Sequence, residues 1–254
     1  MVKITFLGTS SSIPTEKRDN TSFILAHKKL ALLIDCPGSI TQKLLKIGLD
    51  FRKIKDIVIT HEHPDHIYGI ISLIHTQAYF NNSLRIFTTP PSIKIIRRLI
   101  KLFDLNKPHY PKIMYVNVFK KKKFLNKEGL RITAIRNKHI PGSFGIKASW
   151  AKKSLFYSSD TSFSKRMLKE AGRINYLIHD CTASSSFFQK HPFLYKMHTS
   201  ARELSDYLKA FPKIKFIPVH FLLLTKSEEK KIRKELNPVK NRLIWVEDFE
   251  TITL

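Results

Sequence analysis

Cysteine, acidic residues and long apolar segments are all scarce in this chain of 254 residues. The two cysteines, Cys36 and Cys181, are too few for a disulfide framework, so we expect a supporting or incidental role for them. The longest apolar run, residues 216–224, is interrupted by Pro218 and His220 and is too short to span a membrane. The first residues enter a predicted strand without a basic-then-apolar leader. These absences lead us to expect a soluble cytoplasmic protein.

The shortage of acidic residues leaves a net charge of +25, from 45 basic against 20 acidic side chains. Residues 91–153 hold 17 lysines and arginines against two acids, and they include the run Lys120–Lys123. Such a surface would bind polyanions by releasing counterions, so we expect RNA as a partner. The alternative is that heavy lysine and isoleucine usage reflects an AT-rich genome or thermophily. By contrast, residues 226–234 include Glu228 and Glu229 and are predicted to form a solvated helix face.

One short segment concentrates candidate metal ligands. From Thr60 to His66 the sequence is Thr-His-Glu-His-Pro-Asp-His, directly after the apolar run 54–59. A strand that ends this way turns sharply and leaves its polar groups converging at the edge of the sheet. Neutral imidazole and carboxylate suit zinc, manganese or iron, and one such cluster can serve two adjacent ions. A histidine-rich turn without metal is the alternative, but the spacing after a buried strand favours a metal site.

The His-x-His-x-Asp-His spacing resembles the signature of the metallo-β-lactamase superfamily. The resemblance implies an α/β fold, an αββα sandwich of two mixed β-sheets flanked by helices. At 43% hydrophobic residues the chain can fill this fold as one domain, residues 1–254. Further ligands are implied at later strand ends, and single candidates follow apolar runs in the family's order. The implied site holds two divalent ions, zinc first with manganese or iron as alternatives, on His61, His63, His139, Asp65, His66, His220 and a bridging Asp160.

Five further segments resemble motifs of ribonuclease Z, the endonuclease that trims the 3′ end of precursor tRNA. They correspond to its first strand and glycine turn, its PxKxRN loop, its DCGEG turn, and its HEAT and HST loops. Several matches are imperfect: Ser159 stands where the family's SGDT turn has glycine, and Asp180 replaces the glutamate of HEAT. The matching segments are Phe6–Ser10, Pro14–Ser22, Leu33–Gly38, Ile178–Thr182 and His198–Ser200.

One departure from ribonuclease Z concerns its substrate. That family inserts a long arm, which grips the tRNA body, between the ligands that match His139 and Asp160. Here these two residues are only 21 positions apart, and the predicted strands Phe144–Trp150 and Ser154–Tyr157 fill the interval as a hairpin. The sequence therefore retains the implied chemistry but lacks the implied grip on a whole tRNA.

The implied mechanism attacks phosphorus in line with hydroxide and expels an alkoxide. His198, held by Asp180, is the predicted proton donor to this leaving group, and the alternative for His198 is a structural role in a capping loop. Asp65 is counted as both a metal ligand and a catalytic residue. Asp35 is predicted to orient a ligand imidazole, as metal-bound histidines usually require.

These features predict a dinuclear-metal phosphodiesterase or endoribonuclease, similar to ribonuclease Z and acting on RNA such as the 3′ ends of tRNA precursors. The alternative is the same chemistry on a small or cyclic phosphodiester, which needs neither a basic surface nor an arm. A redox protein of the flavodiiron type is disfavoured, because the carboxylate ligand expected near His63 is absent. We expect no membrane partner, and a homodimer is left open.

Alternation of apolar and polar residues predicts the remaining architecture. Strands are predicted at 2–7, 22–26, 30–34, 54–60, 84–88, 113–118, 130–136, 144–150, 154–157, 176–179, 216–219 and 243–246. Helices are predicted at 39–47, 67–79, 92–103, 164–171, 201–211 and 228–236. Serines at 39, 92, 164 and 200 suit helix N-caps or first turns.

Overall fold

Two mixed β-sheets pack face to face in the computed structural model, which describes residues 1–120 and 123–254. The first sheet has the order β13-β1-β2-β3-β4-β5-β6, with β1 (Val2–Gly8), β2 (Ser22–His27), β3 (Leu30–Ile34), β4 (Asp56–Val58), β5 (Ser83–Thr88), β6 (Lys112–Asn117) and β13 (Thr251–Thr253). The second has the order β12-β11-β10-β9-β8-β7, with β7 (Leu125–Lys127), β8 (Leu130–Arg136), β9 (Phe144–Trp150), β10 (Lys153–Tyr157), β11 (Tyr176–Asp180) and β12 (Lys215–Val219).

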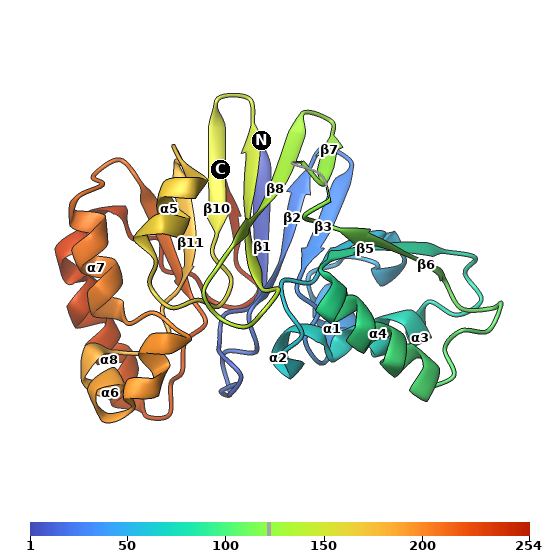
Figure 1. The fold of residues 1–254 in the computed structure, drawn as a ribbon, viewed down its shortest axis with the longest axis horizontal. Helices are drawn as coiled ribbons and strands as arrows, with labels where there is room; N and C mark the ends of the chain where they lie inside the picture. Colours follow the sequence, from blue (N-terminus) through green and yellow to red (C-terminus); the bar gives the residue numbers. More distant parts are fainter. Residues whose placement is uncertain (121–122) are drawn as a thin grey trace.

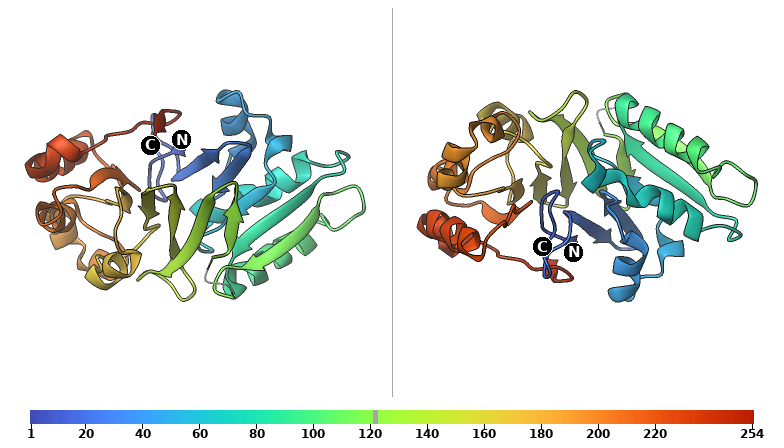
Figure 2. Two further views of the ribbon diagram at one scale, coloured as in Figure 1. Left: turned by 90° about the horizontal axis from the view of Figure 1, so that it is seen from above. Right: turned by 90° about the horizontal axis from the view of Figure 1, so that it is seen from below.

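Helices cover the outer face of each sheet (Figures 1 and 2). Beside the first sheet lie α1 (Ile40–Lys46), α2 (Pro64–Ile67), α3 (Gly69–Thr76) and α4 (Pro90–Leu102). Beside the second lie α5 (Lys165–Ala171), α6 (Ser185–Lys190), α7 (Ala201–Lys209) and α8 (Lys226–Leu236). Three 3₁₀ helices complete the chain: η1 (Phe51–Lys53), η2 (Pro192–Lys196) and η3 (Asn237–Arg242). Within the described ranges, no helix is both long and apolar enough to cross a bilayer.

The core lies in three layers because each sheet buries both of its faces. Alternate residues of β1, such as Val2, Ile4 and Phe6, point into the space between the sheets. There Phe23 of the first sheet meets Tyr157 of the second, with ring centroids 4.9 Å apart in a T-shaped contact. Two outer clusters pack the helices onto the sheets. Burying an aromatic side chain of this kind contributes about 1.5–3 kcal/mol to the stability of the fold. Because Tyr157 is the last residue of β10, this contact joins the two sheets near the carboxyl end of that strand.

The predicted αββα sandwich is confirmed, with several local differences. The predicted strand 54–60 pairs only over Asp56–Val58, and the predicted helix 67–79 is the pair α2 and α3. The sequence did not indicate α6, β7 or β13. The predicted strand 243–246 is wrong, since these residues form an isolated bridge between Leu243 and Phe216 rather than a strand.

One prediction about charge is also wrong. The stretch 226–234 forms part of α8, but Glu228 does not lie on a solvated face. Its side chain is buried, and Glu228 Oε1 accepts a hydrogen bond of 2.8 Å from the backbone N–H of Ser184. Glu228 therefore fastens the start of α6 to α8. Of the lysine run 120–123, Lys121 and Lys122 lie outside the described residues.

Candidate metal centre

The loops that follow four strands bring the predicted metal ligands together. The segment 61–66 follows β4 of the first sheet. His139, Asp160 and His220 follow β8, β10 and β12 of the second sheet. Because parallel strands present their carboxyl ends at the same edge, residues far apart in the chain meet at the join between the two sheets. The structure brings all seven predicted ligands to this one place.

The seven side chains form two groups that share Asp160. In each group the potential ligand atoms lie within 4.8 Å of one another; the first group is His61, His63, His139 and Asp160, and the second is Asp65, His66, Asp160 and His220. Asp160 Oδ2 lies 2.9 Å from His220 Nε2, 3.3 Å from His66 Nε2 and 3.8 Å from His61 Nε2. One carboxylate between two sets of imidazoles is the arrangement that a bridging ligand requires.

Four polar atoms at this point are suited to hold a cation. Among the described residues, the Nε2 atoms of His61, His66 and His220 and Oδ1 of Asp160 are buried without a hydrogen-bond partner. Buried polar atoms are normally paired, because an unpaired one costs about 1–3 kcal/mol. Imidazole nitrogen and carboxylate oxygen are the donors that zinc and other transition metals prefer. The residues present therefore fit two divalent ions.

Neighbouring groups fix the orientation of the imidazoles. His66 Nδ1 donates to Asp35 Oδ2 over 2.9 Å, and His139 Nδ1 donates to the backbone carbonyl of Met197 over 2.9 Å. His220 Nδ1 lies 3.2 Å from the hydroxyl of Thr182. Because each of these Nδ1 atoms has a partner, the Nε2 atom of the ring is left to face the centre. The structure places Asp35 where the sequence predicted it.

Asp35 in turn is held by both sheets. Thr60 donates to it from its backbone N–H, over 2.8 Å, and from its hydroxyl, over 3.0 Å. From the second sheet, the Tyr157 hydroxyl lies 3.4 Å from Asp35 Oδ2. Sequence reasoning did not identify Thr60 or Tyr157 as supports of the centre, because each acts only through hydrogen bonds to Asp35.

Three residues of the centre adopt left-handed backbone conformations: Asp35 with φ 56°, Ser159 with φ 55° and His220 with φ 66°. Non-glycine residues in this region cost about 1–3 kcal/mol each and persist where the surroundings over-determine them. Glycine would adopt this conformation at Ser159 without a steric cost, in line with the glycine of the motif that this turn resembles. The serine hydroxyl offsets part of the cost by donating to the Thr60 hydroxyl over 2.8 Å.

Burial and charge divide the histidines into two kinds. Burial lowers the pKa of His61, and it lowers that of His139 to about 4. Burial also opposes charge on His66 and His220, but the Asp160 carboxylate outweighs it and raises both pKa values, that of His220 to about 10. Burial disfavours the charged form of Asp160 as well, yet His220 and His66 hold its pKa well below the ordinary value. Imidazole and carboxylate bind metal in their deprotonated forms, so metal binding at this centre should release protons.

The predicted acid–base pair lies beside the two groups. His198 Nδ1 and Asp180 Oδ2 are 2.9 Å apart, and the His198 ring centroid is 5.0 Å from those of both His139 and His220. Asp180 is buried and also accepts from the backbone N–H of Thr161 over 3.0 Å. Because Asp180, His198 and His220 also place potential ligand atoms within 4.8 Å, His198 is close enough to act on anything bound at the centre.

Two supports of the centre were missed by sequence reasoning. Glu62 belongs to neither group of potential ligands and accepts from the Ser92 hydroxyl over 2.9 Å, which ties the first turn of α4 to the histidine segment. The Thr89 hydroxyl donates to the carbonyl of Gly142 over 3.1 Å, which ties the same turn to the loop of His139. The pairing of Glu62 with Ser92 could have been suspected only from the unexplained carboxylate between two histidines.

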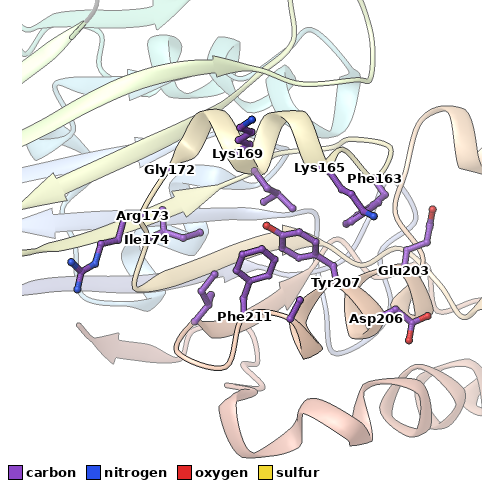
Figure 3. Close-up of a pocket in the computed structure, with 13 residues that line it drawn as sticks. Phe163, Lys165, Lys169, Gly172, Arg173, Ile174, Glu203, Asp206, Tyr207 and Phe211 are labelled. Atoms are coloured by element: carbon purple, nitrogen blue, oxygen red, sulfur yellow. The ribbon is translucent and has the colours of Figure 1, made fainter.

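A large apolar groove lies elsewhere on the molecule, between α5 and α7 (Figure 3). Its volume is about 950 Å³, and Phe163, Tyr207 and Phe211 form much of its wall. None of the seven candidate ligands, nor His198 or Asp180, lines it. The chemistry of this chain is therefore to be sought at the join of the sheets and not in this groove.

Fold and site together define a protein of the metallo-β-lactamase fold, similar to ribonuclease Z. Human tRNase Z, short form, superposes with a TM-score of 0.77 at 20% identity, covering 99% of this chain and 98% of that one. The metallo-β-lactamase fold protein YhfI from Bacillus subtilis superposes with a TM-score of 0.81 at 16% identity, covering 99% and 98%. At these identities the two structures establish the fold alone.

The sequence comparisons give the family. The model of the family described as anti-Pycsar protein Apyc1 matches residues 2–232, so the chain belongs to that family. Ribonuclease Z from Archaeoglobus fulgidus is 29% identical over 145 residues, which are 57% of this chain and 47% of the relative. The chain spans about half the length of that relative. The predicted resemblance to ribonuclease Z is confirmed at the level of sequence similarity.

Proposed function

We propose that this chain is a dinuclear metal-dependent phosphodiesterase, with chemistry of the ribonuclease Z kind. One observation carries the proposal: two groups of potential ligands share Asp160, and the His198–Asp180 pair lies against them. Two divalent ions bound there, with zinc our first choice for these donors, would lower the pKa of a water molecule and neutralise phosphoryl oxygens. The side chains of the chain itself then have three tasks: holding the ions, orienting the ligands and supplying a proton.

His198 is proposed to supply that proton. Its Nδ1–H donates to Asp180, so Nε2 is the atom that can give a proton to the departing alkoxide oxygen. The buried carboxylate stabilises the imidazolium that must exist before the transfer. Asp180 cannot turn away, since the Thr182 hydroxyl, at 2.7 Å, and the Thr161 N–H also donate to it. Asp65, at the rim of the second group, serves as a ligand in this scheme.

The hairpin of β9 and β10 favours a small substrate. Trp150 pairs with Lys153 across a two-residue turn, and the ladder continues to Tyr157 opposite Ile146. Most of the interval between His139 and Asp160 is therefore used in forming the second sheet, and no arm extends from it. A small or cyclic nucleotide phosphodiester needs no such arm, so we place this substrate class first.

RNA, including precursor tRNA, is the second candidate. It is supported by the net charge of +25 and by the similarity to ribonuclease Z over 57% of the chain. We also propose the cytoplasm as the location, because both Cys36 and Cys181 are buried as free thiols, which suits a reducing compartment. A homodimer is an open arrangement that a measurement of mass in solution would decide.

The test of the proposed function is a substrate panel. Zinc-loaded protein is assayed against cyclic nucleotides, single-stranded RNA, precursor tRNA and bis-p-nitrophenyl phosphate. We expect cleavage of bis-p-nitrophenyl phosphate and of at least one natural phosphodiester, abolished by a chelator and restored by added zinc. Activity on cyclic nucleotides without activity on RNA would confirm our order of candidates, and the opposite result would reverse it. Failure on all four substrates with a full metal complement would refute phosphodiester hydrolysis.

A further inference from the structure

The segment between α6 and His198 exposes an unusual set of side chains. Lys190, His191, Phe193 and Lys196 are all exposed, and Phe193 has 61% of its surface in solvent. We call these four residues the η2 platform. Single exposed aromatic residues are common. An exposed ring among lysines close in the chain to a candidate active site is more informative, because proteins use this combination to bind nucleic-acid bases and phosphates.

The platform is connected to the candidate metal centre through the backbone. The N–H groups of Met197 and His198 both donate to the carbonyl of Leu194, over 2.9 Å and 2.7 Å. The carbonyl of Met197 in turn accepts from His139 Nδ1 over 2.9 Å. One turn of chain therefore separates Phe193 from the predicted proton donor. Phe193 is thus five residues from His198 in the same ordered segment.

The base of the platform is rigid. Leu194 is buried in a small cluster with Phe188 and Ala183, and the Tyr195 ring packs on Phe188 with centroids 4.8 Å apart. At the start of α6, the Ser185 hydroxyl donates to Glu235 Oε1 over 2.5 Å. Because its neighbours are fixed in this way, the exposure of Phe193 is imposed by the fold and is not a consequence of a loose loop.

The geometry of η2 also places charge beside the ring. A 3₁₀ helix has three residues per turn, so Phe193 and Lys196 lie on the same side of it. A base stacked on the ring would have a lysine ammonium within reach of its phosphate. We propose that the η2 platform binds the nucleobase of the substrate, with Phe193 as the stacking surface and Lys196 as a phosphate contact. This inference rests on the proposed function and adds the part of the substrate that the metal centre does not recognise.

The test compares two substrates with the same leaving group. Thymidine 5′-p-nitrophenyl phosphate carries a base, and methyl p-nitrophenyl phosphate does not. For Phe193→Ala we expect KM for the thymidine substrate to rise roughly 5-fold or more, the scale of one lost base–aromatic contact. KM and kcat for the methyl substrate should stay within about 2-fold, since no base is present to lose its contact. Phe193→Trp should restore the low KM, because tryptophan also offers a stacking face.

A matched control uses an exposed ring far from the centre. Tyr79, which is 81% exposed and stacks on His109, precedes β5 on the opposite flank. Tyr79→Ala should leave both substrates unchanged, and equal melting temperatures for all variants would confirm intact folding. If Phe193→Ala alters neither substrate, or both equally, the platform is refuted while the phosphodiesterase stands.

A second readout keeps the platform testable if the wild-type protein cleaves neither substrate, which would count against the proposed function. Calorimetric titration with thymidine 5′-monophosphate should then show binding that Phe193→Ala weakens roughly 5-fold or more. Absence of binding, or unchanged affinity in the variant, would overturn the inference.

Discussion

Replacing His198 by alanine tests the proposed proton donor. The His198 side chain is only partly exposed; it packs against His139 and His220 and is hydrogen-bonded to Asp180 over 2.9 Å. General-acid catalysis contributes about 10²–10⁴-fold, and it does so only where the leaving group needs a proton. We therefore expect His198→Ala to lower kcat about 10²–10⁴-fold on a nucleotide or RNA substrate, which expels an alkoxide. On bis-p-nitrophenyl phosphate the loss should be below about 10-fold, because p-nitrophenolate leaves without protonation.

Three measurements make this experiment decisive. Steady-state kinetics on both substrates gives the ratio of losses, and metal analysis of the variant should show the same content as the wild type. Asp180→Asn provides a graded comparison, because asparagine has the same shape as aspartate but lacks the charge that stabilises the imidazolium. We expect this variant to lower kcat on the nucleotide or RNA substrate by less than His198→Ala does. Equal losses on the two substrates, or loss of metal from His198→Ala, would refute the acid role and make His198 a ligand or a structural residue.

Three further predictions test other parts of the structure. Protein purified without chelator should contain more than one transition metal per chain, and Asp160→Asn should lower that number, since both groups use this carboxylate; full occupancy in the variant would contradict the assignment. Glutamine in place of Lys120–Lys123 should flatten the plot of log affinity for RNA against log salt and leave cleavage of a small phosphodiester unchanged. An unchanged slope would mean that these lysines reflect overall amino-acid usage and do not contact RNA. Gly69→Ala should lower the free energy of unfolding in urea by about 3 kcal/mol, because its Cβ would lie 1.9 Å from the carbonyl oxygen of Pro37. Gly38→Ala, where nothing lies within 4 Å, should cost about 1 kcal/mol at most, and equal costs would refute the steric reasoning.

The sequence could predict the fold because its strands have regular patterns and its ligands have characteristic spacing. The prediction failed where a side chain, and not a neighbouring strand, forms the hydrogen bond to a backbone group. Residues 243–246 have an apolar pattern typical of a strand, and Ile244 does donate one backbone hydrogen bond to Phe216. The carbonyl of Val246, however, accepts from the Arg18 guanidinium over 2.9 Å. The hydrogen bond from Arg18 to Val246 joins residues far apart in the chain, so the local sequence pattern does not reveal it. Because this bond occupies the Val246 carbonyl, the pairing with β12 ends after a single bridge.

The candidate site shows the same division. Candidate ligand side chains could be predicted because the His-x-His-x-Asp-His spacing resembles the signature of the metallo-β-lactamase superfamily, which implies further ligands at later strand ends in a fixed order. The groups that orient them could not all be found: Asp35 is a charged residue in a recognisable turn, but the Met197 carbonyl that holds His139 is a backbone atom that any residue would supply. Likewise, Glu228 is buried where its carboxylate accepts from the backbone N–H of Ser184 at the start of α6, a helix that the sequence did not indicate.

The two sheets contribute equally to each group of ligands, and this has a consequence for folding. His61 and His63 come from the first sheet and meet His139 and Asp160 from the second, and the other group is divided in the same way. Neither half of the chain can bind an ion tightly before the halves have docked, so a bound cation stabilises the docked state specifically. A ligand at 1,000 times its dissociation constant adds about 4.1 kcal/mol, which is a large fraction of the stability of an ordinary domain. If the two groups bind metal as we propose, its supply should therefore govern the last step of folding, the closing of one sheet on the other.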